Sequence, residues 1–379
     1  MRLLVTSDLH LSDHIWKHRP IHGDSYHSWK QIVDLAIEKK VDAVVLAGDI
    51  LDKQVNQVEP IRQLLAGLRR LTEAKIPVWF NQGQHEYQST PWMELHTEGL
   101  VWLHERDVEV DGWVISGCDY QNEAQFQEFL RSERALSADI LVCHQVWQDF
   151  MGDVGKPQGK FEDVPKNVKL LITGDYHEHI IVKEHGSPMV LSPGSTHMRS
   201  VAEPEDKEVF IVNLGKGKNS SVQNVPLRTR YCGRISTRQF PGSTSLELAV
   251  KVNAAIKAHL DQADQHSKTW NLPDQLAMPI IQLTHRTDEH DLINTLMQEY
   301  SSKAHLFFKP IQVVSGEDEE SVLPYIDASD KVRMLDCLDN FVDKTQKPMV
   351  HALALALLSS PDPDQALRRW IKEQIDGTV

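Results

Sequence analysis

The first half of the chain repeats one pattern five times: a short apolar run, typical of a buried strand, leads into side chains that can bind metal ions. The residues at these five places are Asp8 and His10, Asp49, Gln84 and His85, His144, and Asp175 and His177. Open α/β sheets place their chemistry just beyond the carboxyl ends of the strands. The pattern therefore predicts an α/β fold in which all five strand ends line one pocket.

Seven of these side chains are candidate metal ligands: Asp8, His10, Asp49, Gln84, His144, Asp175 and His177. One metal ion normally takes about four to six donors, so this set suits two ions with Asp49 as a bridge. Carboxylate, amide and imidazole donors without thiolate favour Mn²⁺, Fe²⁺ or Mg²⁺. Two ions held side by side can stabilise both reacting oxygens of a phosphoryl transfer and generate hydroxide at neutral pH.

His85 has a different expected role, because an imidazole beside the ligand Gln84 can protonate a departing alkoxide. Taken one by one, these residues have structural interpretations. Gly-Asp after a strand is a common turn signal, and a single histidine such as His144 is commonly just a buried, hydrogen-bonded side chain. Donors at five independent strand ends favour the metal site.

In this order, the motifs resemble those of the calcineurin-like metallophosphoesterases. That family carries Asp-x-His, Gly-Asp-x-x-Asp, Gly-Asn-His-Asp/Glu, a single His and Gly-His-x-His, which this chain matches at Asp8, His10, Asp49, His85, Glu86, His144 and His177. The chain departs from the pattern where Gln84 replaces Asn and Asp175 replaces the first His of the last motif. His179 is a reserve ligand if the last motif is shifted by two residues. Because of these two departures, a site that has lost metal binding is an alternative interpretation.

Three further segments resemble the SbcD branch of the family, the nuclease subunit of double-strand-break processing complexes. They are 191–196, with Pro-Gly-Ser, the expected strand 208–214, and 225–230. The resemblance implies a homodimeric DNA exo- or endonuclease that partners an SbcC-type coiled-coil ATPase, and its divergence allows a phage origin. One metal, most simply Mn²⁺, would be held by Asp8, His10, Asp49 and His177, and a second by Asp49, Gln84, His144 and Asp175. His85 would act as catalytic acid, with Glu86 orienting it.

The length of 379 residues predicts two or three domains. We expect a metallophosphoesterase β-sandwich flanked by helices over residues 1–230. A small α/β capping domain that binds DNA is expected over 231–320. A helical segment over 321–379 would bind the ATPase partner, or alternatively pack on its own domain. The sequence contains no P-loop motif, so any ATP dependence must come from a partner.

The formal net charge of −14 argues against nonspecific coating of nucleic acid, but a local patch can still bind DNA. The candidate contacts lie in the loop after His10: His14, Lys17, His18, Arg19 and His22. A solvated polar loop is the alternative, as it is for the basic segment that starts at Arg228. Four scattered cysteines, a strand-like start and no long apolar run predict a cytoplasmic protein, in a host cell if phage-encoded, without membrane contact.

Two other functions remain open. One is a phosphodiesterase or phosphatase that acts on nucleotides or phosphoproteins. The other is a DNA-end-binding scaffold whose site has decayed at Gln84 and Asp175. Release of nucleotides from duplex DNA separates the first from a DNA nuclease, and the metal content of the chain tests the second.

Overall fold

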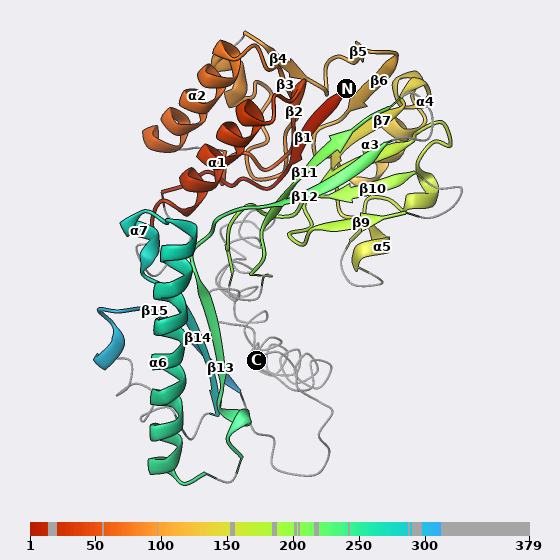
Figure 1. Cartoon of the computed structure of the whole chain (residues 1–379). Coiled ribbons are helices and arrows are strands. Elements are labelled where there is room, and N and C mark those ends of the chain that lie inside the picture. The colour runs from red at the N-terminus through yellow and green to blue at the C-terminus, as the bar shows by residue number, and fades with distance from the viewer. Residues whose placement is uncertain are drawn as a thin grey trace, which may run out of the picture. The chain divides into compact units, whose positions relative to one another are not determined.

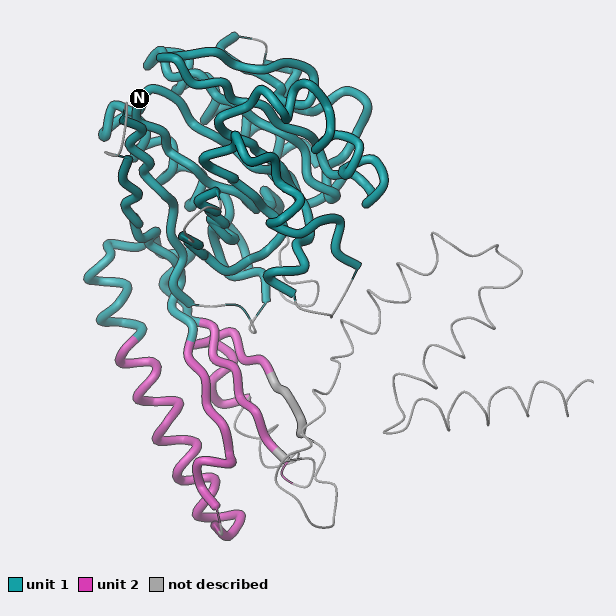
Figure 2. The backbone as a smooth tube through the Cα atoms, turned by 90° about the vertical axis from the view of Figure 1, so that its right-hand side faces the viewer, with its two compact units in different colours: residues 1–232, 263–279 teal, residues 233–262, 280–379 magenta. Residues whose placement is uncertain are grey.

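The computed structural model describes residues 1–13, 21–54, 57–96, 98–151, 156–183, 188–200, 203, 205–215, 220–241, 243–286, 289 and 298–311. The chain forms two compact units (Figure 2). Unit 1 is Met1–Cys232 with Ala263–Pro279, and unit 2 is Gly233–Gln262 with Ile280–Val379. The expected domain boundary at residue 230 lies beside the first break, but Ala263–Pro279, expected in the second domain, returns to unit 1.

The first sheet of unit 1 has the strand order β12-β11-β1-β2-β3-β4 (Figure 1). Its parallel strands are β1 (Arg2–Thr6), β2 (Ala43–Ala47), β3 (Val78–Asn81) and β4 (Leu100–Trp102). On the other side of β1, β11 (Glu208–Asn213) and β12 (Ser221–Pro226) add antiparallel partners. The apolar runs identified in the sequence therefore become the buried parallel strands.

The second sheet has the order β5-β6-β7-β8-β10-β9. Its parallel strands are β6 (Trp113–Gly117), β7 (Ile140–His144), β8 (Leu170–Gly174) and β10 (Met189–Ser192). The edges β5 (Val108–Val110) and β9 (Ile180–Val182) are antiparallel. Both sheets are thus mixed, with parallel strands at their centres.

The core of unit 1 lies in three layers. Strand side chains alternate between faces, so Leu3 and Val5 of β1 pack against the second sheet while Leu4 packs against helices. The first sheet is covered by α1 (Asp24–Glu38) and α2 (Val58–Glu73), and the second by α3 (Glu123–Leu130), α4 (Glu133–Ser137) and α5 (Gln148–Met151). The β-sandwich flanked by helices is therefore confirmed.

Local capping explains why the structure has two helices where the sequence predicts one. One helix was expected over 123–136, but α3 ends before Arg131 and α4 starts afresh. Asn122 forms a capping box with Gln125 at the start of α3, and the Ser132 side chain accepts from Ala135 N at the start of α4. Short 3₁₀ turns also occur in the described part of the chain, at Trp92–Leu95, Phe161–Asp163 and Thr237–Gln239.

Unit 2 contains a three-stranded sheet in the order β13 (Cys232–Ser236), β14 (Ile280–Arg286), β15 (His305–Ile311), with β14 and β15 parallel. Helix α6 (Ser245–Trp270) packs Leu248, Val252 and Ile256 on this sheet, and its last residues belong to unit 1 with α7 (Asp274–Ala277). The helix expected over 288–300 lies mostly outside the described residues, as do the tail helices and the ATPase-binding segment over 321–379.

None of the helices in the described ranges has the length and apolar character needed to cross a bilayer. Cys118, Cys143 and Cys232 are buried free thiols, as expected for the first two.

Candidate metal centre

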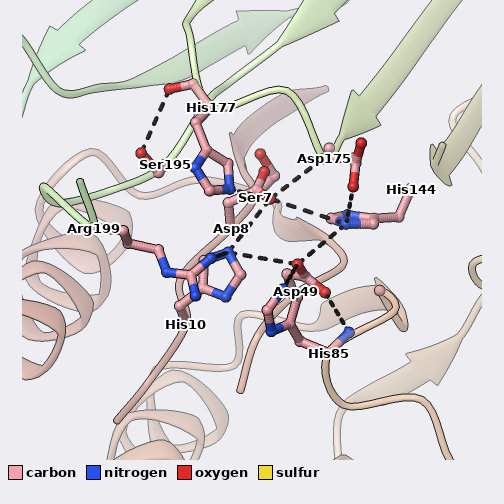
Figure 3. Close-up of polar contacts among 12 residues, drawn as sticks. Ser7, Asp8, His10, Asp49, His85, His144, Asp175, His177, Ser195 and Arg199 are labelled. Carbon is pink, nitrogen blue, oxygen red and sulfur yellow. Dashed lines mark hydrogen bonds and ion pairs between the residues drawn. The ribbon is translucent and has the colours of Figure 1, made fainter. Parts of the chain in front are cut away.

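The carboxyl ends of five parallel strands bring the predicted ligands into one pocket (Figure 3). Asp8 and His10 follow β1, Asp49 follows β2, Gln84 and His85 follow β3, His144 ends β7, and Asp175 and His177 follow β8. Four of these residues have left-handed backbones that non-glycine residues rarely adopt: φ is 50° at Asp8, 40° at His10, 48° at Asp49 and 80° at Asp175. Such conformations concentrate at functional sites, where surrounding packing holds them in place.

Gly83 shows how closely the strand ends approach one another. A Cβ atom at Gly83 would lie 2.0 Å from Asp49 Oδ1, so no other residue fits without moving that carboxylate. The next turn residue, His85, donates its backbone N–H to the same Asp49 oxygen at 3.0 Å. The glycine in this motif is therefore required by the position of the carboxylate.

The first group of potential ligands is Asp8, His10 and His177. Asp8 Oδ1 lies 3.7 Å from Nε2 of each histidine, and Asp49 Oδ2 lies 3.5 Å from His10 Nε2. Asp8, His10 and Asp49 are fully or almost fully buried. These four residues are the ones expected at one metal ion.

His177 is fixed by a carboxylate behind it. His177 Nδ1 lies 2.9 Å from Glu203 Oε1, and a carboxylate only accepts, so this nitrogen carries the proton. Nε2 is left to face Asp8. A hydrogen bond of this kind fixes the tautomer and the ring plane of a metal-binding histidine.

The second group is Asp8, Asp49 and His144, and a third is His10, Asp52 and His85. His144 Nε2 lies 3.5 Å from Asp49 Oδ2 and 4.0 Å from Asp8 Oδ1. Its Nδ1 lies 2.8 Å from the carbonyl oxygen of Ala47, to which it donates. Asp8 therefore belongs to the first and second groups and is as central as Asp49, the expected bridge.

Gln84 and Asp175, the two departures from the family pattern, lie together at the edge of the second group. Gln84 Nε2 donates to Asp175 Oδ1, and that oxygen lies 3.8 Å from His144 Nε2. The amide oxygen of Gln84 is buried and has no hydrogen-bond partner among the described residues. Asp175 thus offers an oxygen near His144, and Gln84 has a buried oxygen without a described partner. His179, the reserve ligand, instead lies 3.7 Å from Glu208.

His85 is the most exposed imidazole of the pocket, with 35% of its side chain accessible. Its Nδ1 donates to the carbonyl oxygen of Asp52 at 3.0 Å, and its Nε2 lies 3.8 Å from Asp49 Oδ2. The carboxylate of Glu86 accepts from Gly83 N at 2.9 Å, and so supports the turn that carries His85. The orienting role expected for Glu86 stays a prediction, and the contact described here is with the backbone of the turn.

Arg199 extends a cation into the pocket. One guanidinium nitrogen lies 2.8 Å from His10 Nε2, and the other donates to Asp52 Oδ1 at 2.6 Å. Burial, with the charge of Arg199 next, holds the pKa of His10 well below its usual value. A lowered pKa favours the neutral imidazole, the form that binds metal ions. A metal ion bound at Nε2 requires the guanidinium to move away.

The pocket concentrates negative charge in a buried space. Burial raises the pKa of Asp8. Burial also opposes ionisation of Asp49, but His144 and the N–H of His85 overcome it and lower the pKa of Asp49 to about 2. The pKa of Glu86 is raised to about 8, first by burial and then by the charge of Asp49. A divalent cation would relieve both the burial cost and the repulsion.

The donors fit divalent metal ions. Asp8 Oδ2, Gln84 Oε1 and His144 Nε2 are buried polar atoms without hydrogen-bond partners in the described part of the chain. Buried polar atoms are rarely left without a partner, and an ion is one way to supply it. The oxygen and nitrogen donors are those of a hard or borderline metal such as Mn²⁺ or Mg²⁺.

Three residues of the pocket were not identified from the sequence: Asp52, Arg199 and Glu203. Asp52 is the last residue of the Gly-Asp-x-x-Asp motif, so its signal was available. The other two lie between β10 and β11, where the Pro-Gly-Ser resemblance marked the segment but no individual side chain. Of the candidate DNA contacts, His14, Lys17, His18 and Arg19 fall outside the described residues, and His22 is exposed with Nδ1 2.8 Å from Asp13 O.

Arg230, from the second basic segment, is not available to DNA. It is 4% exposed and forms a bidentate ion pair with Asp24 at 2.8–2.9 Å.

Known proteins are similar to the part of the chain that carries this site. Residues 1–179 match the family model of calcineurin-like phosphoesterases. The DNA double-strand break repair protein Mre11 of Methanosarcina mazei is 29% identical over 239 residues, and that of Methanosarcina acetivorans is 30% identical over 241 residues. Each match covers 60% of this chain and 39% of the relative. The metallophosphoesterase YhaO of Bacillus subtilis, named as uncharacterized, is 25% identical over 239 residues, 57% of this chain and 58% of that protein.

The chain thus matches about two fifths of the length of the Methanosarcina proteins. Residues 1–179, which match the family model, hold all five strand ends described above. Residues 1–179 are thus similar to the calcineurin-like phosphoesterases, and similar proteins of known name include archaeal Mre11 proteins.

Proposed function

We propose that this chain is a metal-dependent DNA nuclease, an SbcD-like subunit of a recombination and DNA-break-processing complex. The observation that carries the proposal is the convergence of Asp8, Asp49, His144 and His177 next to the accessible imidazole of His85. The names of the Mre11 relatives support DNA as the substrate. Metal ions held by this pocket would activate water and neutralise the charge of a scissile phosphodiester.

His85 would move the proton in this reaction. Its Nδ1–H is committed to the carbonyl of Asp52, so Nε2 is the atom that gains or loses the exchangeable proton. The carboxylates of Asp49 and Asp52 lie 3.8 and 4.0 Å from its ring nitrogens. Because His85 is partly exposed, Nε2 can reach a departing 3′ oxygen. The backbone bond to Asp49 holds the residue beside a carboxylate that lies 3.5 Å from both His10 Nε2 and His144 Nε2.

The further parts of the proposal come from the resemblance to the SbcD branch. Mn²⁺ is the proposed metal, a homodimer the proposed assembly, and an SbcC-type coiled-coil ATPase the proposed partner of the segment 321–379. The loop with His14, Lys17, His18, Arg19 and His22 is proposed to hold phosphates that flank the scissile one. Residues 231–320 are proposed as a capping domain over the substrate.

Nuclease activity on end-labelled duplex DNA with Mn²⁺ tests the proposal. We expect the parent chain to release nucleotides. The His85→Gln variant should lose about 10²- to 10⁴-fold in rate while binding as much Mn²⁺ as the parent. His179→Gln is the matched control, since this histidine pairs with Glu208 outside the ligand groups, and it should cleave like the parent.

Each alternative function predicts a different result. Turnover of small phosphodiesters without DNA cleavage would indicate a phosphodiesterase. A chain that binds DNA ends but takes up no Mn²⁺ would indicate a decayed scaffold. Two observations argue against decay: the buried amide oxygen of Gln84 has no partner among the described residues, and Asp175 Oδ1 lies 3.8 Å from His144 Nε2. Cleavage by His85→Gln at the parent rate would remove this histidine from the mechanism.

A further inference from the structure

The connection between β10 and β11 forms hydrogen bonds with both the backbone and the side chain of His177. Ser195, in this connection, donates its backbone N–H to the carbonyl oxygen of His177 at 3.2 Å, and Ser195 Oγ lies 3.5 Å from the same oxygen (Figure 3). Glu203, eight residues further on, accepts from the imidazole Nδ1. One short segment of chain thus fixes both the backbone and the side chain of this ligand.

Gly194 is the residue that allows this close approach. Its φ is +72°, and an added Cβ atom would lie 2.8 Å from the carbonyl oxygen of His177 and 2.9 Å from the backbone nitrogen of His179. Both contacts are with backbone, which cannot rotate away. The Pro-Gly-Ser segment therefore has a structural reason for its glycine: it lets the connection lie directly against the turn that carries His177.

Glu203 is itself held in place by a buried cation. Lys207 Nζ donates to Glu203 Oε2 at 2.9 Å and to Ser195 Oγ at 2.7 Å, and Ser195 Oγ lies 2.8 Å from the same Glu203 oxygen. The Lys207 side chain is 1% exposed and that of Glu203 10%. One carboxylate oxygen binds the lysine and serine, which leaves the other directed at His177. A carboxylate with both oxygens fixed sets the orientation of the imidazole it binds.

We propose that Glu203 is a positioning residue for the metal ligand His177, and that Lys207 and Ser195 hold Glu203 in the orientation this requires. This inference rests on the proposed metal-dependent function but concerns metal binding alone. Glu203 keeps the proton of His177 on Nδ1 and the lone pair of Nε2 toward Asp8, 3.7 Å away. Without it, the ring can rotate or take the other tautomer, and the group formed by Asp8, His10 and His177 loses a ligand.

Mn²⁺ titration of the full chain by calorimetry, with electron paramagnetic resonance of the bound ions, tests this role. For Glu203→Gln we expect Mn²⁺ affinity at the His177 position to fall about 10- to 100-fold. Affinity at the His144 position should stay at the parent value, so the spectrum of a coupled Mn²⁺ pair gives way to that of one isolated ion. The matched control is Asp206→Asn, which removes an exposed carboxylate three residues away.

Glu203→Gln leaves Lys207 as a buried unpaired cation, so that variant can lose stability. The double variant Glu203→Gln/Lys207→Met removes both charges and separates folding from positioning. We expect it to melt near the parent temperature and still to bind Mn²⁺ weakly at the His177 position. Parent-like affinity in this folded double variant overturns the proposal, as does a parent chain that binds no Mn²⁺. A parent that binds two Mn²⁺ ions but cleaves no DNA contradicts the nuclease proposal. The role of Glu203 is then still decided by comparing the Mn²⁺ affinities of the parent and the double variant.

Discussion

The imidazole of His144, on the second sheet, is anchored by the first sheet: its Nδ1 donates to the carbonyl oxygen of Ala47, the last residue of β2, at 2.8 Å. This bond determines which nitrogen remains for a metal ion. It also connects the ends of β2 and β7, which come from different sheets. The candidate site is therefore formed by the packing of the two sheets as well as by each strand end.

Replacing His144 should abolish one of the two metal positions. His144→Asn shortens the side chain and removes Nε2 from Asp49 and Asp8, so Mn²⁺ affinity should fall by more than the roughly 10- to 100-fold that an outer partner contributes. Calorimetric titration measures this. His96→Asn is the control, because that ring bonds Thr72 Oγ1 at 2.8 Å, outside the ligand groups. Two unchanged binding steps in His144→Asn would contradict the assignment.

Arg199→Gln should strengthen metal binding. The guanidinium lies 2.8 Å from His10 Nε2, so it competes with a cation for that lone pair and adds like charge. We expect Mn²⁺ affinity to rise in the variant, and Arg62→Gln, which loses only an exposed ion pair with Glu59, to bind like the parent. A lower affinity in Arg199→Gln would mean that the arginine supports the ligands instead of competing with the ion.

The core between the first sheet and its helices predicts a large loss of stability on truncation. Phe80 in β3 is fully buried in this layer, so Phe80→Ala should lower the free energy of unfolding by about 3–5 kcal/mol. Leu95→Ala, at a side chain that is 62% exposed, should change it by less than about 0.5 kcal/mol. Urea unfolding followed by tryptophan fluorescence measures both. Equal losses in the two variants would contradict this packing.

The buried thiols should resist modification in the folded chain. Burial raises the pKa of Cys143 to about 12 and that of Cys118 well above its usual value, so neither forms a reactive thiolate near neutral pH. Peptide mapping after alkylation should find both unlabelled in native protein and labelled after denaturation. Fast labelling of either thiol at neutral pH would show that its strand is accessible.

The parts of the fold that follow from local pattern could be predicted from the sequence. Apolar runs such as that in β1 are recognisable alone, and the carboxyl ends of parallel strands meet wherever the sheets pack. This is why the sequence alone predicts that Asp8, Asp49, His144 and His177 lie together, as they do in the structure. Helix boundaries that depend on a capping side chain, such as Ser132 between α3 and α4, are harder to predict from the sequence, because one hydrogen bond decides them.

The supporting residues could not be predicted, because their partners are distant in sequence and follow no period. Glu203 lies 26 residues from His177, and Arg199 lies 189 residues from His10. A glutamate or an arginine in a connection is usually a surface charge. Only the packing of the segment after β10 against the turn at His177 makes these two part of the site. The return of Ala263–Pro279 to unit 1 is likewise a tertiary effect.

The most direct test of the metal centre is a crystal structure of the chain with Mn²⁺ and its anomalous difference map at the manganese edge. Two peaks are predicted, both beside Asp8 and Asp49, one contacting His10 and His177 and the other contacting His144. A map without peaks at these side chains, from crystals that contain Mn²⁺, would contradict the central claim that the five strand ends form a two-metal site.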